Sequence, residues 1–350
     1  MQEHIRLETI GCDLGDKKSA VCVLGADGQV VERTEARTTR AGMTKFFTRP
    51  RAHVVIEVGA HSRWVSELLK ALGHELTIAN PRRVALISQN DNKSDRNDAE
   101  LLARLGRSDP SLLSPLKHRS AEAQGELAVA KARDALVSAR TRLINHVRAV
   151  VKSFGDRLPS CTGESFHKKT IHAVPDVLKP ALGPLYEVLG ELATQIRAHD
   201  KSLVQIAKKH SDVRILEQVS GVGTLTAVTF LLTLGDKDRF SSSRMAGAYL
   251  GLRPRKSQSG NDDPQLRITK AGDPFLRRLL VNCANHILGP FGQDSSLRTW
   301  GLKLVGRGGK NARKRAKVAV ARKLAVLLHR LWVTGEVYEP VGYQAKRLAA

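Results

Sequence analysis

The chain has 350 residues, 41% of them hydrophobic, which is enough for two or three domains with cores of their own and excludes a disordered tail. Its formal net charge of +23 points to phosphate-rich partners, with a merely basic surface as the alternative, and an aromatic content of only 4% disfavours binding by base stacking. No apolar run reaches the length of a membrane-spanning helix, and residues 1–15 lack a signal-peptide pattern, so we expect a cytoplasmic protein.

The first 110 residues predict alternating strands and helices. Alternating apolar residues and turn signals predict strands over residues 5–15, 19–25, 29–36, 53–60 and 74–80. Helical spacing predicts helices over residues 39–47, 61–73 and 81–90, and another that continues through Leu105. This order is typical of an α/β layer fold, in which the first and fourth strands are neighbours.

The middle of the chain predicts two long helices, at residues 118–153 and 184–210, because both stretches have helical spacing and no strand character. Residues 155–180 contain three prolines and predict a connecting loop with short turns. The two helices could pair as an antiparallel hairpin, or each could pair with another copy of the chain.

From residue 213 onward the composition again predicts a packed, mainly helical domain. Gly221 and Gly223 separate two helical segments, which is typical of a helix–hairpin–helix that offers backbone N–H groups to a phosphate, or of a simple helix break. A polar loop follows at residues 256–265, and a basic amphipathic helix ends the domain. The densest basic block of the chain lies at residues 306–317.

Four acidic residues of the N-terminal part stand at strand ends or at a helix start: Asp13, Glu57, Asp95 and Asp98. Carboxylates that meet at one edge of a sheet repel one another, and a hard divalent cation such as Mg²⁺ would keep them ionised. Two such ions can hold the attacking and leaving oxygens of a phosphodiester. Alternatively, such acids form turns or cap helices, and Asp95 in particular could be an N-cap.

The cysteines point to no metal or redox chemistry. Cys12, Cys22, Cys161 and Cys283 are scattered and form no CxxC pair. We therefore expect neither structural zinc nor a disulfide framework, but four buried thiols that act as small hydrophobic residues.

Four segments together resemble a known family: GCDLGDKKSAVCVL, VVIEVGAHSRWVSELL, NKSDRNDAELLARL and GLRPRKSQSGNDDPQLRITKAGDPFLRRLLV. They are similar to the DEDD transposases of the insertion sequence 110 family, in the same order and over nearly the whole chain. The resemblance implies a RuvC-like, ribonuclease H-type domain at residues 1–115, a helical coiled-coil linker at 116–210 and a mainly helical transposase domain at 211–340. It also implies an RNA-guided DNA recombinase that acts in the bacterial cytoplasm at the nucleoid.

The resemblance also implies roles for single residues. The family's acidic tetrad falls on Asp13, Glu57, Asp95 and Asp98, which would be catalytic ligands of Mg²⁺. Its nucleophilic serine falls on Ser259, with Ser257 as the rival, and Asn261 stands where the family has a second glycine.

Nearby basic residues would contact nucleic acid: Arg253, Arg255, Lys256, Arg267, Lys270, Arg277 and Arg278. For the last two, a solvated helix face is the alternative. The implied partners are donor and target DNA, a structured noncoding guide RNA and further copies of the chain, as a dimer or tetramer. Two other functions remain open: a RuvC-like junction nuclease that uses water and Mg²⁺, and a non-catalytic scaffold that binds nucleic acid.

Overall fold

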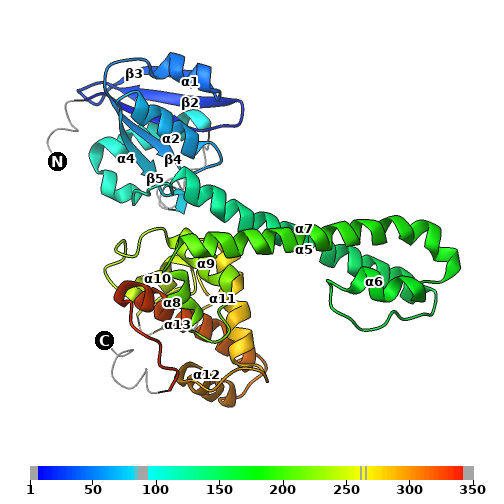
Figure 1. Cartoon of the computed structure of the whole chain (residues 1–350). Helices are drawn as coiled ribbons and strands as arrows, with labels where there is room; N and C mark the ends of the chain where they lie inside the picture. The colour runs from blue at the N-terminus through cyan, green and yellow to red at the C-terminus, as the bar shows by residue number, and fades with distance from the viewer. Residues whose placement is uncertain (1–6, 83, 85–93, 261, 265, 342–350) are drawn as a thin grey trace. The chain divides into compact units, whose positions relative to one another are not determined.

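The computed structural model describes residues 7–82, 84, 94–260, 262–264 and 266–341, and it divides into two compact units. Unit 1 spans Met1–His118 and unit 2 spans Arg119–Ala350. The architecture is mixed α/β with one five-stranded sheet and a mostly helical remainder, as the sequence predicted (Figure 1). Within the described residues, no helix is both long and apolar enough to cross a bilayer.

The sheet of unit 1 has the order β3-β2-β1-β4-β5. Its strands are β1 (Thr9–Asp13), β2 (Lys18–Leu24), β3 (Val30–Arg37), β4 (His53–Glu57) and β5 (Glu75–Ala79). Strands β1, β2 and β3 form an antiparallel meander, whereas β4 pairs in parallel with both β1 and β5. All five predicted strands are confirmed, and so is the prediction that the first and fourth strands are neighbours.

Helices cover both faces of this sheet. On one face, α1 (Arg40–Phe47) and α2 (Ser62–Ala71) bury Ile10, Cys12 and Ile56 in an apolar core. On the other face lies α4 (Asp95–Ser108), whose small residues Ala99 and Ala103 pack against β2. The predicted helix at residues 81–90 falls largely outside the described residues. Alternation of side chains along the strands thus gives each face its own core.

A long helical arm opens unit 2. Helix α5 (Ala121–Ser153) packs along α7 (Lys179–Lys209), and ion pairs of Lys209 with Glu126 and of Arg133 with Asp200 show that the two run antiparallel (Figure 1). The predicted antiparallel hairpin therefore forms within one chain. Between them lie α6 (Phe166–Thr170) and two short 3₁₀ turns.

The arm differs from the prediction in one respect. Helix α7 begins at Lys179, five residues before the predicted start, and includes Pro180 at its first turn and Pro184 inside it. Proline is tolerated in a first turn, where the N–H groups have no partner within the helix. The predicted loop is also not loose: Leu158, Phe166 and Val174 pack with the two long helices in a separate apolar core.

The rest of unit 2 is a helical bundle around one large core. Its helices are α8 (Val213–Glu217), α9 (Thr224–Leu234), α10 (Ser243–Tyr249), α11 (Pro274–Ile287), α12 (Ser296–Gly306) and α13 (Ala312–Thr334). The last nine residues of α9 are all buried, so this short apolar helix lies in the middle of the bundle. All four cysteines are free, and three are buried as expected, whereas Cys161 is half-buried.

Candidate functional site

The first two predicted acids lie side by side at one edge of the sheet. Asp13 ends β1 and Glu57 ends β4, and the parallel register that pairs Cys12 with Ile56 makes them the next pair in line. Adjacent strands lie roughly 5 Å apart, and residues in register point to the same face. Because Cys12 and Ile56 face the α1 and α2 core, Asp13 and Glu57 face the opposite side, where α4 packs.

The backbone of α4 packs directly against the backbone of this face of the sheet. A Cβ added to Gly11 would collide with the Ala99 carbonyl oxygen, and a Cβ added to Gly106 would collide with Val55. Residue 55 pairs with residue 11, and the end of α4 reaches back to the other end of the sheet, where Arg107 donates to the Ala26 carbonyl oxygen. The helix therefore runs antiparallel to β1 and β4, with its first turn at their carboxyl ends.

Electrostatics gives the same placement for the first turn of α4. The pKa of Glu35 is held below its usual range mainly by its hydrogen bond to Lys18, and the charge of Arg96 contributes. Glu35 pairs with Ala20, which in turn pairs with Asp13. Arg96, the second residue of α4, thus lies near the carboxyl end of β1, where Asp13 stands.

The last two predicted acids lie in this first turn. Ser94 is the N-cap of α4, and its hydroxyl accepts a hydrogen bond from the Asn97 N–H at 3.3 Å, so the alternative that Asp95 caps the helix is wrong. Asp95 is exposed and Asp98 is half-buried. Carboxylates here are favoured by the positive end of the helix dipole, which is a structural reason for acids at these positions.

The donor set fits a magnesium site, although the side chains are not gathered into a ligand shell. All four groups are carboxylates, the oxygen ligands that Mg²⁺ takes, and the backbone brings both strand ends and the helix start to one edge. Among the described residues, however, no three His, Cys, Asp or Glu side chains converge as metal ligands would. The neighbouring Cys12 is not a candidate ligand, because burial, with a smaller contribution from the charge of Asp13, raises the pKa of its thiol to about 12.

The predicted nucleophile lies on an exposed hairpin of unit 2, which we call the serine ribbon (residues 251–271). Backbone hydrogen bonds join its two sides, from Lys270 N–H to the Gly251 carbonyl at the base to a mutual pair between Ser259 and Asp262 at the tip. Ser257 and Ser259 are both exposed. Gly260 has a φ of +56°, which suits the tight turn after Ser259.

The ribbon carries an excess of positive charge that faces water. The predicted contacts Arg253, Arg255, Lys256, Arg267 and Lys270 are all exposed. The Arg255 N–H donates to the Arg267 carbonyl at 2.9 Å, so these two residues stand opposite each other across the ribbon. Like charges directly opposite are destabilising, and a phosphate between them would relieve the repulsion.

The base of the ribbon is held by contacts that the sequence reading missed. Gly251 and Gly272 have φ values of +69° and +68°, and a Cβ on either would collide with main-chain atoms of the opposite side. Nη1 of Arg277 donates to the carbonyl oxygens of Leu250 (3.0 Å) and Ala271 (2.6 Å), one at each end of the ribbon. Nη1 of Arg277 thus ties the two ends of the ribbon together, and the nucleic-acid contact expected of Arg277 stays a prediction.

Its neighbour Arg278 is placed differently. Its Nη2 lies 2.5 Å from Asp134 on α5, and its guanidinium lies 5.5 Å from the Phe275 ring. The side chain is 48% exposed, which agrees with the alternative of a solvated helix face.

The turn between α8 and α9, expected as a helix–hairpin–helix or a simple helix break, carries an acid beside the start of α9. Gly221 has a φ of +90°, and Gly223 begins α9 without a side-chain cap. The Thr224 hydroxyl donates to Glu217 at 2.6 Å, so a carboxylate already lies beside the start of α9. This favours the simpler interpretation of a helix break.

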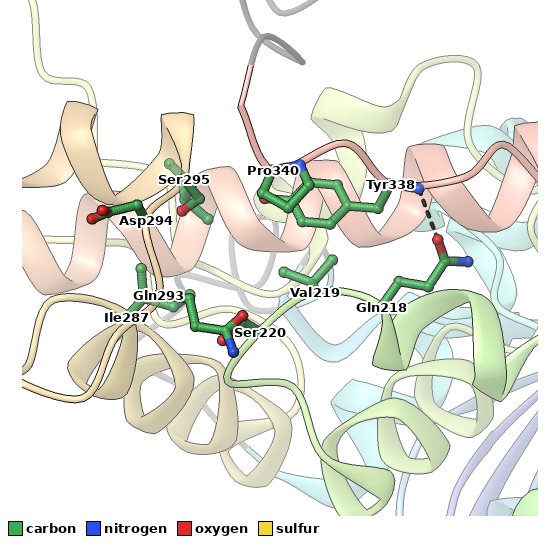
Figure 2. A pocket seen from close by; sticks show the side chains of 10 residues that line it. Gln218, Val219, Ser220, Ile287, Gln293, Asp294, Ser295, Tyr338 and Pro340 are labelled. Atoms are coloured by element: carbon green, nitrogen blue, oxygen red, sulfur yellow. Dashed lines mark hydrogen bonds between the residues drawn. The ribbon is translucent and has the colours of Figure 1, made fainter.

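A small pocket of unit 2 contains none of the predicted site residues. It lies where α8 and α12 meet the segment after α13, and it is lined by Gln218, Val219, Ser220, Ile287, Gln293, Asp294, Ser295, Leu297, Tyr338 and Pro340 (Figure 2). The Tyr338 N–H donates to Gln218 at 2.8 Å, and the Ser295 hydroxyl caps α12. These polar groups serve packing, so the pocket adds nothing to the candidate site.

Comparisons with known proteins match two separate segments of the chain to transposase families. Residues 10–155 match a family model of DEDD transposases of IS110, described as a transposase, and residues 213–295 match the model of the transposase IS116/IS110/IS902 family. The transposase of insertion sequence element IS1328 from Yersinia enterocolitica is 31% identical over 281 residues, which cover 79% of this chain and 82% of the relative. The chain belongs to the IS110 family of insertion-sequence transposases.

Other transposases match almost end to end. The transposase of IS1111A from Coxiella burnetii is 26% identical over 339 residues, which cover 95% of this chain and 91% of the relative. A probable family 20 transposase from Pseudomonas aeruginosa is 28% identical over 96% of this chain and all of its own length. This transposase is therefore a DNA-recombining enzyme, and the two matched segments contain the acidic edge and the serine ribbon respectively.

Proposed function

We propose that this transposase is a magnesium-dependent, RNA-guided recombinase that moves its insertion sequence through a serine–DNA intermediate. The metal-dependent part is supported by one observation: two parallel strand ends and one helix start bring Asp13, Glu57, Asp95 and Asp98 to the same edge. The sheet order, with three antiparallel strands followed by two parallel ones, supports a ribonuclease H-type, RuvC-like domain. The guide RNA and the assembly into a dimer or tetramer are carried over from the family resemblance.

The four carboxylates would hold Mg²⁺, which supplies charge neutralisation at a phosphodiester when bound. Asp95 is exposed in the first turn of α4, so a cation and a nucleic-acid strand could both approach its carboxylate. The positions of the four carboxylates would determine where Mg²⁺ binds, and therefore where a phosphate could be held. In this proposal the domains at residues 1–115, 116–210 and 211–340 divide metal binding, assembly and strand attack among them.

The serine ribbon would carry the covalent step. The Ser259 Oγ attacks a backbone phosphorus, a serine–phosphate ester forms, and the bond from phosphorus to the neighbouring sugar oxygen breaks. The serine proton passes to a base, and the departing sugar oxygen takes up a proton. Because one phosphate ester replaces another, the reverse attack by a sugar hydroxyl rejoins DNA without an added energy source. Arg255 and Arg267 would hold the phosphate during this exchange.

Two variants at the tip of the ribbon test the covalent step. In Ser259→Ala, end-labelled DNA should no longer run with the protein on a denaturing gel, whereas Ser257→Ala should retain the linked species. Asp13→Asn should also abolish it while leaving DNA affinity largely intact. Strand cleavage that survives in Ser259→Ala would instead identify a nuclease that uses water, and no cleavage by the wild type with Mg²⁺ would leave only a scaffold.

The guide RNA needs its own experiment. RNA that remains bound to the purified protein at high salt is sequenced, and recombination is assayed on DNA that matches its loops. Failure to recover a discrete RNA would remove the RNA-guided part of the proposal and leave the serine chemistry to stand on the gel assay.

A further inference from the structure

The end of unit 2 contains a stretch of unbalanced positive charge outside both segments that match the family models. Residues 295–335 include eleven lysines and arginines and not one aspartate or glutamate. Six of these side chains lie between the later part of α12 and the first turn of α13: Lys303, Arg307, Lys310, Arg313, Lys314 and Arg315. We call them the basic corner.

The basic corner is exposed and has no internal partners. All six residues are exposed, and within the described part of the chain none forms an ion pair or a side-chain hydrogen bond. Exposed basic residues elsewhere do pair, for example Lys18 with Glu35, Lys179 with Asp176 and Arg197 with Glu164. The positive charge of the corner is therefore left for something outside the chain.

The corner is also held rigidly in place. A Cβ on Gly301 of α12 would come 2.6 Å from side-chain atoms of Leu288 and Val320, and Ala312 and Ala316 of α13 are buried. Between the helices, Gly308 and Gly309 have φ values of +77° and +92° and make the connection tight. Six charged residues thus fall within thirteen positions at the connection between two packed helices. Figure 1 shows these two helices, α12 and α13.

The charges lie where they cost the folded protein stability. The first turn of α13 contains Arg313, Lys314 and Arg315 and no acid, and its N-cap residue Asn311 makes no capping side-chain bond. Positive charges at the N-terminal end of a helix oppose the helix dipole, and like charges on neighbouring residues repel. A polyanion would relieve both effects, because its phosphates meet the basic side chains and the positive helix end together.

The kind of polyanion follows from what the corner lacks. Recognition of single strands uses exposed aromatic platforms, but Trp300 is covered by Lys323, whose Nζ lies 4.2 Å from the ring centroid, and Trp332 is buried. Lysine and arginine without aromatic residues suit the sugar-phosphate backbone of a duplex. We propose that the basic corner docks the backbone of duplex DNA, at a surface additional to the serine ribbon and independent of the serine chemistry.

The test is the salt dependence of DNA binding by the full chain. The variant Arg313→Gln/Lys314→Gln/Arg315→Gln is compared with a control that loses three paired charges, Lys18→Gln/Lys179→Gln/Arg197→Gln. A short fluorescein-labelled DNA duplex is titrated by anisotropy between about 50 and 200 mM salt. If each of the three residues meets a phosphate, the slope of log K against log salt should flatten by about 2.7. Across that salt range the wild type should then lose about 40-fold more affinity than the variant.

Three outcomes are distinguishable. The proposal holds if the corner variant shows the flatter slope and the control keeps the wild-type slope. It is overturned if both variants behave alike, because the effect would then reflect net charge alone. It is also overturned if only the affinity for an RNA duplex of the same length changes. Circular dichroism melting of both variants confirms that the comparison is made between folded proteins.

Discussion

Replacing Arg277 by methionine should destabilise unit 2 much more than the same replacement at its neighbour Arg278. The Arg277 guanidinium donates to two main-chain carbonyl oxygens, Leu250 and Ala271, in a half-buried position. A hydrogen bond from a charged donor contributes about 1.5–3 kcal/mol, and because one nitrogen makes both bonds we expect a loss of about 2–4 kcal/mol. Methionine keeps most of the aliphatic length of the side chain, so the loss reports on the hydrogen bonds.

Arg278→Met is the matched control. Its partner Asp134 and its own side chain are partly exposed, and a surface ion pair contributes about 0–1 kcal/mol. Its cation–π contact with Phe275 adds about 0.5–1 kcal/mol, so the expected loss is near 1 kcal/mol. Both variants remove one positive charge from adjacent positions of α11.

The free energy of unfolding is measured by urea denaturation, followed by tryptophan fluorescence. Limited proteolysis supplies the second readout: in Arg277→Met, cleavage within residues 253–267 should become faster, because both ends of the serine ribbon lose their tie. Equal destabilisation by the two replacements, with unchanged cleavage of the ribbon, would refute this reasoning. Lost DNA affinity without lost stability in Arg277→Met would instead support the sequence-based expectation that Arg277 contacts nucleic acid.

Two further predictions concern unit 1. Gly11→Ala should destabilise the protein by about 1–3 kcal/mol and lower DNA cleavage, because the added methyl group would displace α4 from the acidic edge. The control is Gly59→Ala, because an added Cβ there meets nothing within 4 Å. It should change stability by less than about 0.5 kcal/mol in the same denaturation assay. Arg33→Gln removes the hydrogen bond that does most to lower the pKa of Glu100, so it should lower the free energy of unfolding slightly at pH 7. Because the folded-state pKa of Glu100 is the lower one, the difference between wild type and variant should be complete above about pH 4.3 and disappear as the pH falls below it. A difference that persists in acid would contradict this assignment.

The sequence was sufficient to predict the sheet because its strands alternate strictly between two cores. Ile10 and Cys12 face one core and Gly11 faces α4, and this period of two is visible without a structure. The order of strands and helices, typical of an α/β layer fold, also predicted that β1 and β4 are neighbours. The acidic tetrad and the serine nucleophile remain predictions, although the backbone brings all four acids to one edge.

What the sequence could not decide has physical causes that lie beyond the local residue pattern. Pro180 suggested that the loop extends to residue 180, but α7 already begins at Lys179, because its packing against α5 outweighs the weak local preference. Ser94 and Asp95 are both good caps, and only the backbone, extended at Ser94, decides between them. Arg277 and Arg278 are adjacent and alike in sequence, and their different roles depend on which carbonyl oxygens the fold brings near one side of α11.

The close backbone packing at the base of the serine ribbon has a consequence for which sequence changes this enzyme can accept. A Cβ on Gly251 or Gly272 would collide with main-chain atoms of the opposite side, while every described residue from 253 to 267 is exposed. The ribbon is therefore an exchangeable cassette: its tip can be lengthened, shortened or swapped for that of a relative without repacking the helices. Such chimaeras should fold as long as the two glycines and Arg277 are kept, which makes the ribbon the natural place to graft altered strand chemistry onto an unchanged scaffold.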